Sequence, residues 1–591
     1  MAMEAHELGP TIRGTDWMTS ERIYGVRVER DVAVPLKDGV RLLCDVFRPD
    51  ADGRFPAILG CHPYHRLGQT APIRPTALST AQWRHPGQER TNASLEAGDP
   101  NLFVRRGYAH VVCSVRGTGG SEGKWSFVGE QEVEDVLEVI RWIARQPWCN
   151  GQVAMFGVSY FAWIQLFAAA KGTEELRCLF CPWAATDFYR DFVYRGGLLA
   201  WQWLVGWSQT SLTYSQCQPE LVSKRAYDDQ TLRQKIAELL QDEDLAAIPE
   251  LRQALANPES GMNPFIVDIL LHPLYDDYWR ERTVELERIS VPAYLGGDWG
   301  IYGLHLPGAF RAWKRIPAPK KLIIGPPVYL DRPLYQLQFE ALRWFDYWLK
   351  GIQTGILEEP PVRLFVMGTG EWKETTDWPV PGTRWVPLFL HQGGMLLDRE
   401  PPEDGGSSAY EDSPWYRGSV EFRTPPMVES MEVLGPIVLK LYASSTDTDV
   451  FWIVSLYHED GSGERKLLTR GWLRGSHREV DWEKSAIWEI HHRHDRMTPL
   501  APGEVYEFWI NVRPTGVLVR PGERLVLKIA GVEDPPTNPL ELIGTGSLRR
   551  QRPSRVVIQH NARFPSYLLL PVTRGNLLGL YVSGGEFPRG G

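Results

Sequence analysis

The chain has 591 residues, of which 43% are hydrophobic and 23% charged, the balance of an ordinary globular protein. One hydrophobic core rarely serves so long a chain, so we expect about two to four domains. The net charge of -9 argues against the basic face that nucleic-acid binding requires. No run of about 18 apolar residues predicts a membrane span. We therefore expect no nucleic-acid partner and no membrane partner.

The cysteines and the N-terminal residues bear on the cellular compartment. All seven cysteines lie between Cys44 and Cys217, and the only C-x-x-C pattern, Cys178 to Cys181, stands in apolar surroundings without a second pair. The N-terminal residues contain no apolar core of a signal peptide. These observations predict reduced, buried thiols in a cytoplasmic protein, with no metal and no cofactor.

The first part of the chain predicts the start of a sheet. Alternating residues predict strands over 24–28, 31–35 and 40–47, and apolar runs predict buried strands over 55–60 and 108–115. Apolar residues at a spacing of three to four predict a helix over 131–146. A polar loop follows the strand at 55–60, at the strand end where α/β sheets bind ligands. It contains His62, Tyr64 and His65.

The chain then reaches a serine between a predicted strand and a predicted helix. The apolar run 151–156 is typical of a buried strand, and the alanine-rich run 162–170 is typical of a buried helix. Gly157-Val158-Ser159 lies between them, as in a nucleophile elbow, where a tight turn exposes the hydroxyl above the sheet. Phe161 occupies the place of the second glycine in the G-x-S-x-G signature. The motif alone is therefore weak.

The pattern of strands and helices continues beyond the serine. Strands are expected at 179–185, 291–299 and 322–327, the last of them ending the sheet, with helices near 306–313 and 339–350. This alternation favours a parallel sheet with helical crossovers. Between the predicted strands at 179–185 and 291–299, residues 187–286 show helical stretches and no obvious strand. This segment indicates a helical cap. Its tryptophans line a pocket or only pack the cap: Trp201, Trp203 and Trp207.

From Pro361 onwards the chain is predicted to be all β. Short strands separated by turn residues predict a β-sandwich or jelly roll. They are expected at 362–367, 385–391, 437–443, 451–458, 505–511, 524–531 and 555–560. A histidine-rich run, His491 to His494, has no spaced carboxylate or cysteine frame. A loop or strand end is therefore the default interpretation, ahead of a metal site.

Several stretches together resemble the CocE/NonD family of serine hydrolases, the family of cocaine esterase and X-prolyl dipeptidyl aminopeptidase. They are Arg30 to Pro49, Pro63-Tyr64, Val115 to Gly123, Gln146 to Val153, Gly157 to Tyr160, Thr186 to Tyr189, Leu342 to Gly351 and Phe564 to Pro571. The resemblance implies an α/β-hydrolase domain with a helical cap insertion and a C-terminal all-β jelly-roll sandwich. The corresponding ranges are 1–187 with 287–351, 188–286 and 360–591.

The resemblance also implies roles for residues of the elbow and the tyrosine loop. Ser159 corresponds to the nucleophile. The hydroxyl of Tyr64 and the backbone N–H of Tyr160 correspond to the two donors that bind the oxyanion. Two such donors, placed in advance at the developing charge, contribute about 3 kcal/mol each in acyl transfer.

Two family positions differ in this chain. In the run Gly296-Gly297-Asp298-Trp299-Gly300, the family's acid position holds Gly300, and an aspartate stands two residues earlier. The position of the family's histidine holds Tyr329. The chain thus corresponds to a variant without the usual catalytic histidine, and with its acid displaced or absent.

A serine hydroxyl needs a base to accept its proton, so three hypotheses follow. In the first, another histidine is the base: His305 with Asp298 as its acid, or His62 or His65. In the second, Ser159 acts without a histidine base, or the chemistry is other than simple hydrolysis. In the third, the site is catalytically silent and binds a ligand. His305 also fits a buried histidine at a helix start, and Asp298 a helix N-cap. Asp331, two residues past Tyr329, is a weaker acid candidate, and a solvated loop residue is the default interpretation of it.

The function predicted is hydrolysis of a small-molecule ester or amide through an acyl-enzyme on Ser159, with a non-standard base. The alternatives are an X-prolyl dipeptidyl aminopeptidase and a silent, ligand-binding member of the same fold. Trp299 and Tyr329 complete the candidate pocket with the histidines of the tyrosine loop and the tryptophans of the cap. A homo-oligomer is compatible with the sequence.

Overall fold

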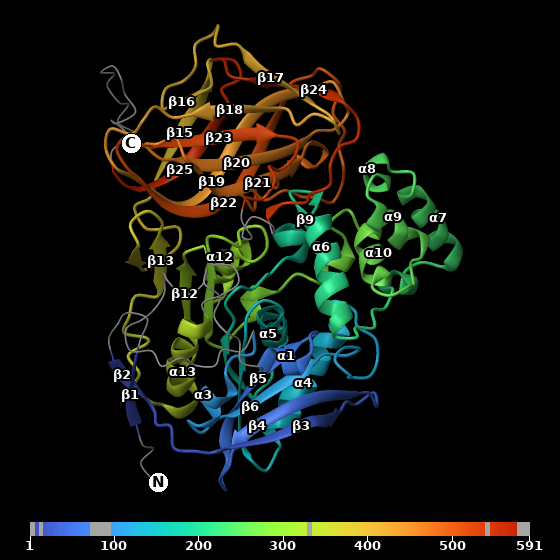
Figure 1. The fold of residues 1–591 in the computed structure, drawn as a ribbon, viewed down its shortest axis with the longest axis vertical. Coiled ribbons are helices and arrows are strands. Elements are labelled where there is room, and N and C mark those ends of the chain that lie inside the picture. Colours follow the sequence, from blue (N-terminus) through green and yellow to red (C-terminus); the bar gives the residue numbers. More distant parts are fainter. Residues whose placement is uncertain (1–5, 11–15, 71–95, 328–333, 538–543, 576–591) are drawn as a thin grey trace.

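The structure is a computed structural model and describes residues 6–10, 16–70, 96–327, 334–537 and 544–575 (Figure 1). Two large sheets organise these residues, one of ten strands and one of eleven. The ten-stranded sheet carries the cap on one side, and the eleven-stranded β domain lies above both in the view of Figure 1. The first described residues form a separate hairpin of β1 (His6–Pro10) and β2 (Asp16–Ser20).

The ten-stranded sheet has the order β14-β13-β12-β11-β8-β7-β5-β6-β4-β3. Its central strands, from β6 to β13, pair in parallel, and antiparallel strands stand at both edges. This arrangement confirms the predicted α/β class. The strands are β3 (Val26–Pro35), β4 (Arg41–Pro49), β5 (Phe55–His62), β6 (Ala109–Ser114), β7 (Cys149–Phe156), β8 (Leu176–Phe180), β11 (Ala293–Asp298), β12 (Lys320–Gly325), β13 (Val362–Val366) and β14 (Glu371–Thr375).

Helices cover both faces of this sheet, and most of them bury apolar residues against it. The covering helices are α1 (Arg66–Thr70), α3 (Pro100–Val104), α4 (Glu130–Ala144), α5 (Tyr160–Lys171), α12 (Leu306–Arg315) and α13 (Leu334–Lys350). α5 is buried along almost its whole length and packs between α4 and strands β5, β7 and β8. In the described part of the chain, no helix is both long and apolar enough to cross a membrane.

One strand assignment from the sequence is wrong. Residues 362–367 are predicted to begin the β domain, yet β13 extends the first sheet, in parallel with β12, and β14 follows it. The strand at 322–327 is therefore not the last of that sheet. The alternating burial of β13 would be the same in the first sheet and in the β domain. The period of apolar residues predicts that a strand forms, but it does not predict which sheet the strand joins.

The cap is mainly helical, as predicted. It comprises η1 (Tyr189–Val193), α6 (Trp201–Trp207), η2 (Ser208–Leu212), η3 (Val222–Arg225), α7 (Asp229–Leu239), α8 (Glu243–Ala246), α9 (Pro249–Ala256), α10 (Asn263–Leu271), α11 (Asp277–Arg280) and η4 (Leu286–Arg288). It also holds a short hairpin of β9 (Tyr194–Arg195) and β10 (Leu198–Leu199), which the sequence pattern does not reveal because each strand has two residues.

The β domain is a barrel-like sandwich around its own apolar core. A pairing between β19 and β25 links two strands far apart in the sheet order. The strands are β15 (Arg384–His391), β16 (Met395–Leu397), β17 (Ser407–Asp412), β18 (Ser419–Arg423), β19 (Met431–Ser445), β20 (Phe451–Glu459), β21 (Arg465–Arg474), β22 (Tyr506–Val519), β23 (Arg524–Ala530), β24 (Ser554–Gln559) and β25 (Tyr567–Arg574), with a 3-10 turn η5 (Gly475–His477).

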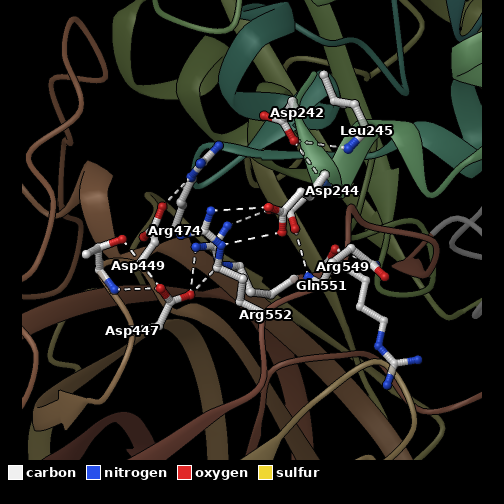
Figure 2. Close-up of polar contacts among 12 residues, drawn as sticks. Asp242, Asp244, Leu245, Asp447, Asp449, Arg474, Arg549, Gln551 and Arg552 are labelled. Atoms are coloured by element: carbon white, nitrogen blue, oxygen red, sulfur yellow. Dashed lines mark hydrogen bonds and ion pairs between the residues drawn. The ribbon is translucent and has the colours of Figure 1, made fainter. Parts of the chain in front are cut away.

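The cap and the β domain meet in a cluster of charged side chains (Figure 2). Arg550 donates to Asp244 of α8 at 2.9 Å and to Asp447 of the β domain at 2.7 Å. Asp242 caps the first turn of α8, which fixes the helix at this contact. All seven cysteines have free thiols, and six are buried, as predicted.

Candidate active site

Ser159 lies at a strained turn between β7 and α5. Its φ of 59° falls in the left-handed region, which a residue with a side chain adopts only when its surroundings enforce it. Gly157, two residues earlier, has a φ of 134°, and a Cβ there would lie 2.5 Å from Cβ of Phe161. The turn therefore has the geometry of a nucleophile elbow, with the serine at the N-terminus of a buried helix.

The hydroxyl of Ser159 contacts a histidine from a distant part of the chain. Oγ of Ser159 lies 3.2 Å from Nε2 of His305, which stands at the start of α12. Only 5% of Ser159 and 1% of His305 are exposed. Burial lowers the pKa of His305 to about 3, so its ring is neutral near pH 7. A neutral imidazole within hydrogen-bond distance of a hydroxyl can accept its proton.

Asp298 does not pair with His305 in this structure. Its Oδ1 accepts the backbone N–H groups of Gly300 and Ile301, at 2.7 and 3.1 Å, and its Oδ2 accepts the indole N–H of Trp183 at 2.6 Å. Nδ1 of His305 is buried and has no hydrogen-bond partner among the described residues. The predicted acid–base pair is thus not formed, because the turn after β11 and Trp183 hold the carboxylate.

Tyr64 approaches the elbow from the loop after β5. Its ring makes an edge contact with that of Tyr160, the first residue of α5, at a centroid distance of 6.4 Å. Its hydroxyl accepts the indole N–H of Trp207 at 3.3 Å, and Tyr64 is half-buried. Trp207 belongs to α6, so the cap fixes this hydroxyl. The ring of Tyr64 thus lies against Tyr160, the residue that follows Ser159 in the chain.

The other predicted pocket residues fall into three groups. Trp203 and Trp207 stack at 5.3 Å, and Trp207 also contacts Tyr160, so both belong to the roof over the elbow. His62 is buried beneath, stacked on Phe161 at 4.5 Å, and His65 is exposed beside Tyr214, so neither substitutes as the base of Ser159. Trp201 is half-buried and packs against the core.

Trp299 points away from the elbow. Its indole N–H donates to the carbonyl of Phe365 in β13 at 2.7 Å, and its ring stacks near Phe310 and Trp378. The prediction that it lines the pocket of Ser159 is therefore wrong, because the side chain fills the junction with the β domain. Tyr329 and Asp331 lie outside the described residues.

Sequence reasoning missed a carboxylate behind the elbow. The hydroxyl of Tyr160 donates to Glu132 of α4 at 2.7 Å and accepts the indole N–H of Trp125 at 3.1 Å. Burial raises the pKa of Glu132 to about 7. The sequence offered one signal for this contact, since Glu132 lies on the apolar face of the helix predicted over 131–146. A carboxyl that is buried there needs a hydrogen-bond partner.

The histidine-rich run lies elsewhere, against the cap. Nδ1 of His494 is 3.0 Å from Nδ1 of His477, and burial lowers the pKa of both rings, that of His477 to about 3. Within the described ranges, no group of three or more His, Cys, Asp or Glu side chains could hold a metal ion.

Comparison with known proteins agrees with this geometry along most of the chain. Residues 38–328 match the family model described as X-Pro dipeptidyl-peptidase (S15 family), and residues 354–569 match the X-Pro dipeptidyl-peptidase C-terminal non-catalytic domain. The chain is 28% identical to cocaine esterase of Rhodococcus sp. (strain MB1 Bresler), over 93% of this chain and 99% of that protein. The chain belongs to the CocE/NonD hydrolase family.

Two further proteins agree with this chain in fold or sequence. The solved CocE/NonD family hydrolase from Staphylococcus aureus superposes with a TM-score of 0.74 at 24% identity, over 96% of both chains. A putative Xaa-Pro dipeptidyl-peptidase of Bacillus anthracis is 21% identical over 82% of this chain and 79% of that protein. The chain is therefore a hydrolase with the CocE/NonD architecture of an α/β-hydrolase domain and a C-terminal β domain.

Proposed function

We propose that this CocE/NonD chain hydrolyses a carboxylic ester of a small molecule, with Ser159 as the nucleophile and His305 as the general base. The observation that supports this assignment most directly is the 3.2 Å contact between Oγ of Ser159 and Nε2 of His305. Nε2 accepts the hydroxyl proton while Oγ attacks the acyl carbon. The same proton then passes to the leaving alcohol, and a water molecule repeats the sequence to release the acid.

The oxyanion of the tetrahedral intermediate requires donors close to Ser159. We assign this role to the hydroxyl of Tyr64 and the backbone N–H of Tyr160, at the positive end of α5. The contact with Trp207 supports the assignment because it holds the tyrosine hydroxyl in place before substrate arrives. We therefore expect Tyr64→Phe to lower kcat by about 10²-fold or more.

The proposed base, His305, differs from the usual one in its position in the chain. It also differs in having no carboxylate of the described ranges hydrogen-bonded to its ring. When Nε2 accepts a proton, the proton already on the ring must sit on Nδ1, which has no partner among the described residues. We propose that burial, and not a carboxylate, keeps this imidazole neutral and positioned. The aromatic roof of Trp203 and Trp207 favours an apolar or aromatic acyl group.

The assignment is tested with a fluorophosphonate probe and the ester p-nitrophenyl butyrate. We expect the wild type to be labelled and to release p-nitrophenol, and Ser159→Ala to do neither. His305→Ala should lose about 10³-fold or more in kcat. His65→Ala is the matched control, since this histidine is exposed, and should keep the wild-type rate. Full activity in His305→Ala would exclude His305 as the base.

The family descriptions support a second candidate, an aminopeptidase that cleaves after an X-Pro pair. This reaction uses the same serine and acyl-enzyme but needs an acidic anchor for a free amino terminus. Ala-Pro-p-nitroanilide distinguishes the two candidates. A peptidase should cleave it faster than it cleaves p-nitrophenyl butyrate. It should also cleave it faster than N-acetylated Ala-Pro-p-nitroanilide, which has no free amino terminus. Ligand-induced stabilisation without labelling or turnover would instead support the silent, ligand-binding hypothesis.

A further inference from the structure

A cavity lies along α12, outside the site of Ser159. Its volume is about 660 Å³, in the range of small-molecule sites, and it opens where the hydrolase domain, the cap and the β domain meet. Pro307, Phe310, Arg311 and Lys314 line it at a spacing of three to four, so one face of α12 forms a wall. None of the residues assigned above to the candidate active site lines this cavity.

The cavity is rich in cations, and most of these already have an acidic partner. Five of its six Lys and Arg side chains form ion pairs: Arg190 with Asp187, Arg311 with Asp191, Lys314 with Glu489, Arg315 with Glu287 and Lys484 with Asp481. These pairs leave the remaining cation, Arg513, as the one that could bind an added anion.

Arg513 has no carboxylate partner among the described residues. Its Nη2 donates to the carbonyls of Arg190 and Asp191, at 2.8 and 3.3 Å, which fixes the plane of the guanidinium. Burial lowers its pKa to about 10, so it remains charged near pH 7. A fixed guanidinium with unused N–H groups beside a cavity matches the two oxygens of a carboxylate.

The other walls are largely apolar and aromatic, with Thr283, Asn511 and the histidines His491, His492 and His494 among their polar members. The apolar members include Phe310, Trp378, Trp472, Trp488, Pro436 and Ile437. Such a lining binds a hydrophobic body, whereas the single unpaired cation sets the charge of the ligand at about one negative unit. A phosphate dianion would fit less well, because the other cations of the lining are already paired with acids and leave no second positive charge for it.

We propose that this cavity binds a small organic carboxylate with an aromatic or branched apolar body, whose oxygens pair with Arg513. The acid released by an ester hydrolase belongs to this chemical class. The proposal itself stands on the cavity and does not depend on the reaction at Ser159. It concerns a separate site, because His305 begins α12 while the lining residues follow along that helix.

The test uses isothermal titration of the full chain carrying Ser159→Ala, so that no covalent chemistry takes place at residue 159. Phenylacetate is the probe, and 2-phenylethanol is its uncharged counterpart of similar size. We expect phenylacetate to bind with a Kd below about 10 mM, and 2-phenylethanol to bind at least about tenfold more weakly. Equal affinity for the two compounds, or no binding of phenylacetate, would overturn the proposal.

Arg513→Gln should weaken phenylacetate binding by about tenfold or more. Arg478→Gln is the matched control, because Arg478 is also half-buried, donates to two backbone carbonyls and lies outside the cavity. Arg513→Lys, which keeps the charge and loses the fork, gives an intermediate affinity and serves if the glutamine variant does not fold. Equal loss in the Arg513 and Arg478 variants would contradict the site, as would a crystal structure with phenylacetate bound only beside residue 159.

Discussion

Phe161 explains how this elbow dispenses with the second glycine of its signature. The side chain at this position must pass between the turn and strand β5, and Gly60 of β5 leaves the space. A Cβ at Gly60 would lie 2.9 Å from the ring of Phe161 and 3.3 Å from the carbonyl of Phe156. Gly60 of the neighbouring strand thus provides the space that the second glycine of the motif would otherwise provide. The ring of Phe161 fills this space and stacks on His62.

Replacing Gly60 with alanine should therefore disturb the elbow. Gly60→Ala forces Phe161 to shift, and overpacking of this kind costs about 1–3 kcal/mol in unfolding free energy. We expect a lower midpoint in urea unfolding and a lower kcat on p-nitrophenyl butyrate. Gly68→Ala is the control, since a Cβ at Gly68 would meet nothing within 4 Å. Equal effects of the two substitutions would contradict this account.

The low pKa of His305 predicts an unusual pH profile. A general base works only when neutral, and burial lowers the pKa of His305 from the ordinary 6.5 to about 3. The neutral form therefore persists below pH 6.5, so kcat/KM should show no acidic limb between pH 8 and about pH 5. A limb centred near pH 6.5 would show that the histidine is solvated or paired with a carboxylate. Return of activity after a jump back to pH 7 separates this effect from unfolding.

The sequence allowed part of this site to be predicted. The positions of Ser159 and Tyr64 could be predicted because each follows a strand that the apolar pattern reveals, and their catalytic roles stay predictions that the family resemblance implies. His305 was one of three alternatives, and only the fold brings it to Ser159 while leaving His62 beneath Phe161. The direction of the Asp298 side chain could not be predicted, because it depends on Trp183, a residue more than one hundred positions away.

The short helix α8 is joined to the β domain by buried charges (Figure 2). The side chains of Asp244 and Asp447 are 3% and 8% exposed, and Arg550 lies between them. Removing one partner of a buried pair leaves an uncompensated charge, which makes such contacts more costly to break than surface pairs. This cluster therefore holds the cap against the β domain.

Asp244→Ala should destabilise the chain by about 3–5 kcal/mol. The nearby pair of Glu243 and Arg552 provides a matched control, because both side chains are more than half exposed, at 59% and 56%. Glu243→Ala should leave the urea midpoint almost unchanged, because water and salt screen an exposed pair. Urea unfolding of Asp244→Ala, of Arg550→Ala and of the double variant Asp244→Ala/Arg550→Ala measures the coupling, with Glu243→Ala as the control. Independent, additive losses at Asp244 and Arg550 would exclude the pairing.

Most helices and strands could be predicted from the period of apolar residues. The neighbouring strand with which each strand pairs could not be predicted in this way. Strands β5, β7 and β11 and helices α4, α5 and α12 lie close to their predicted ranges because each buries a continuous apolar face. Two strands of two residues in the cap carry no period. The sheet to which β13 belongs is set by its pairing with β12, a tertiary contact.

Buried histidines give the whole molecule a common response to acid. Burial lowers the pKa of His110 and His491 to about 4 and that of His477 and His492 to about 3. In the unfolded chain these rings titrate near 6.5, so the unfolded state binds more protons below that pH. Their contribution to stability is complete above pH 6.5 and is lost as the pH falls toward 3–4.

His110→Phe should weaken this response. His110 is fully buried among Phe47, Phe103 and Phe156, so a phenyl ring fits its surroundings and carries no proton. We expect the urea midpoint of this variant to fall less between pH 7 and pH 5 than that of the wild type. The variant His65→Phe, at an exposed position, should follow the wild type. Parallel curves for all three proteins would contradict the assignment.

Strands β13 and β14 also decide where this molecule can be divided. A hydrolase domain expressed alone and ended at residue 351 would lack β13 and β14, and β12 would become a free edge. That edge would offer the unpaired backbone groups of an apolar strand, Lys320–Gly325, to any other chain. Such a fragment should self-associate. Extension to residue 375 would restore the sheet, so the separable unit ends after the strands that the sequence assigns to the other domain.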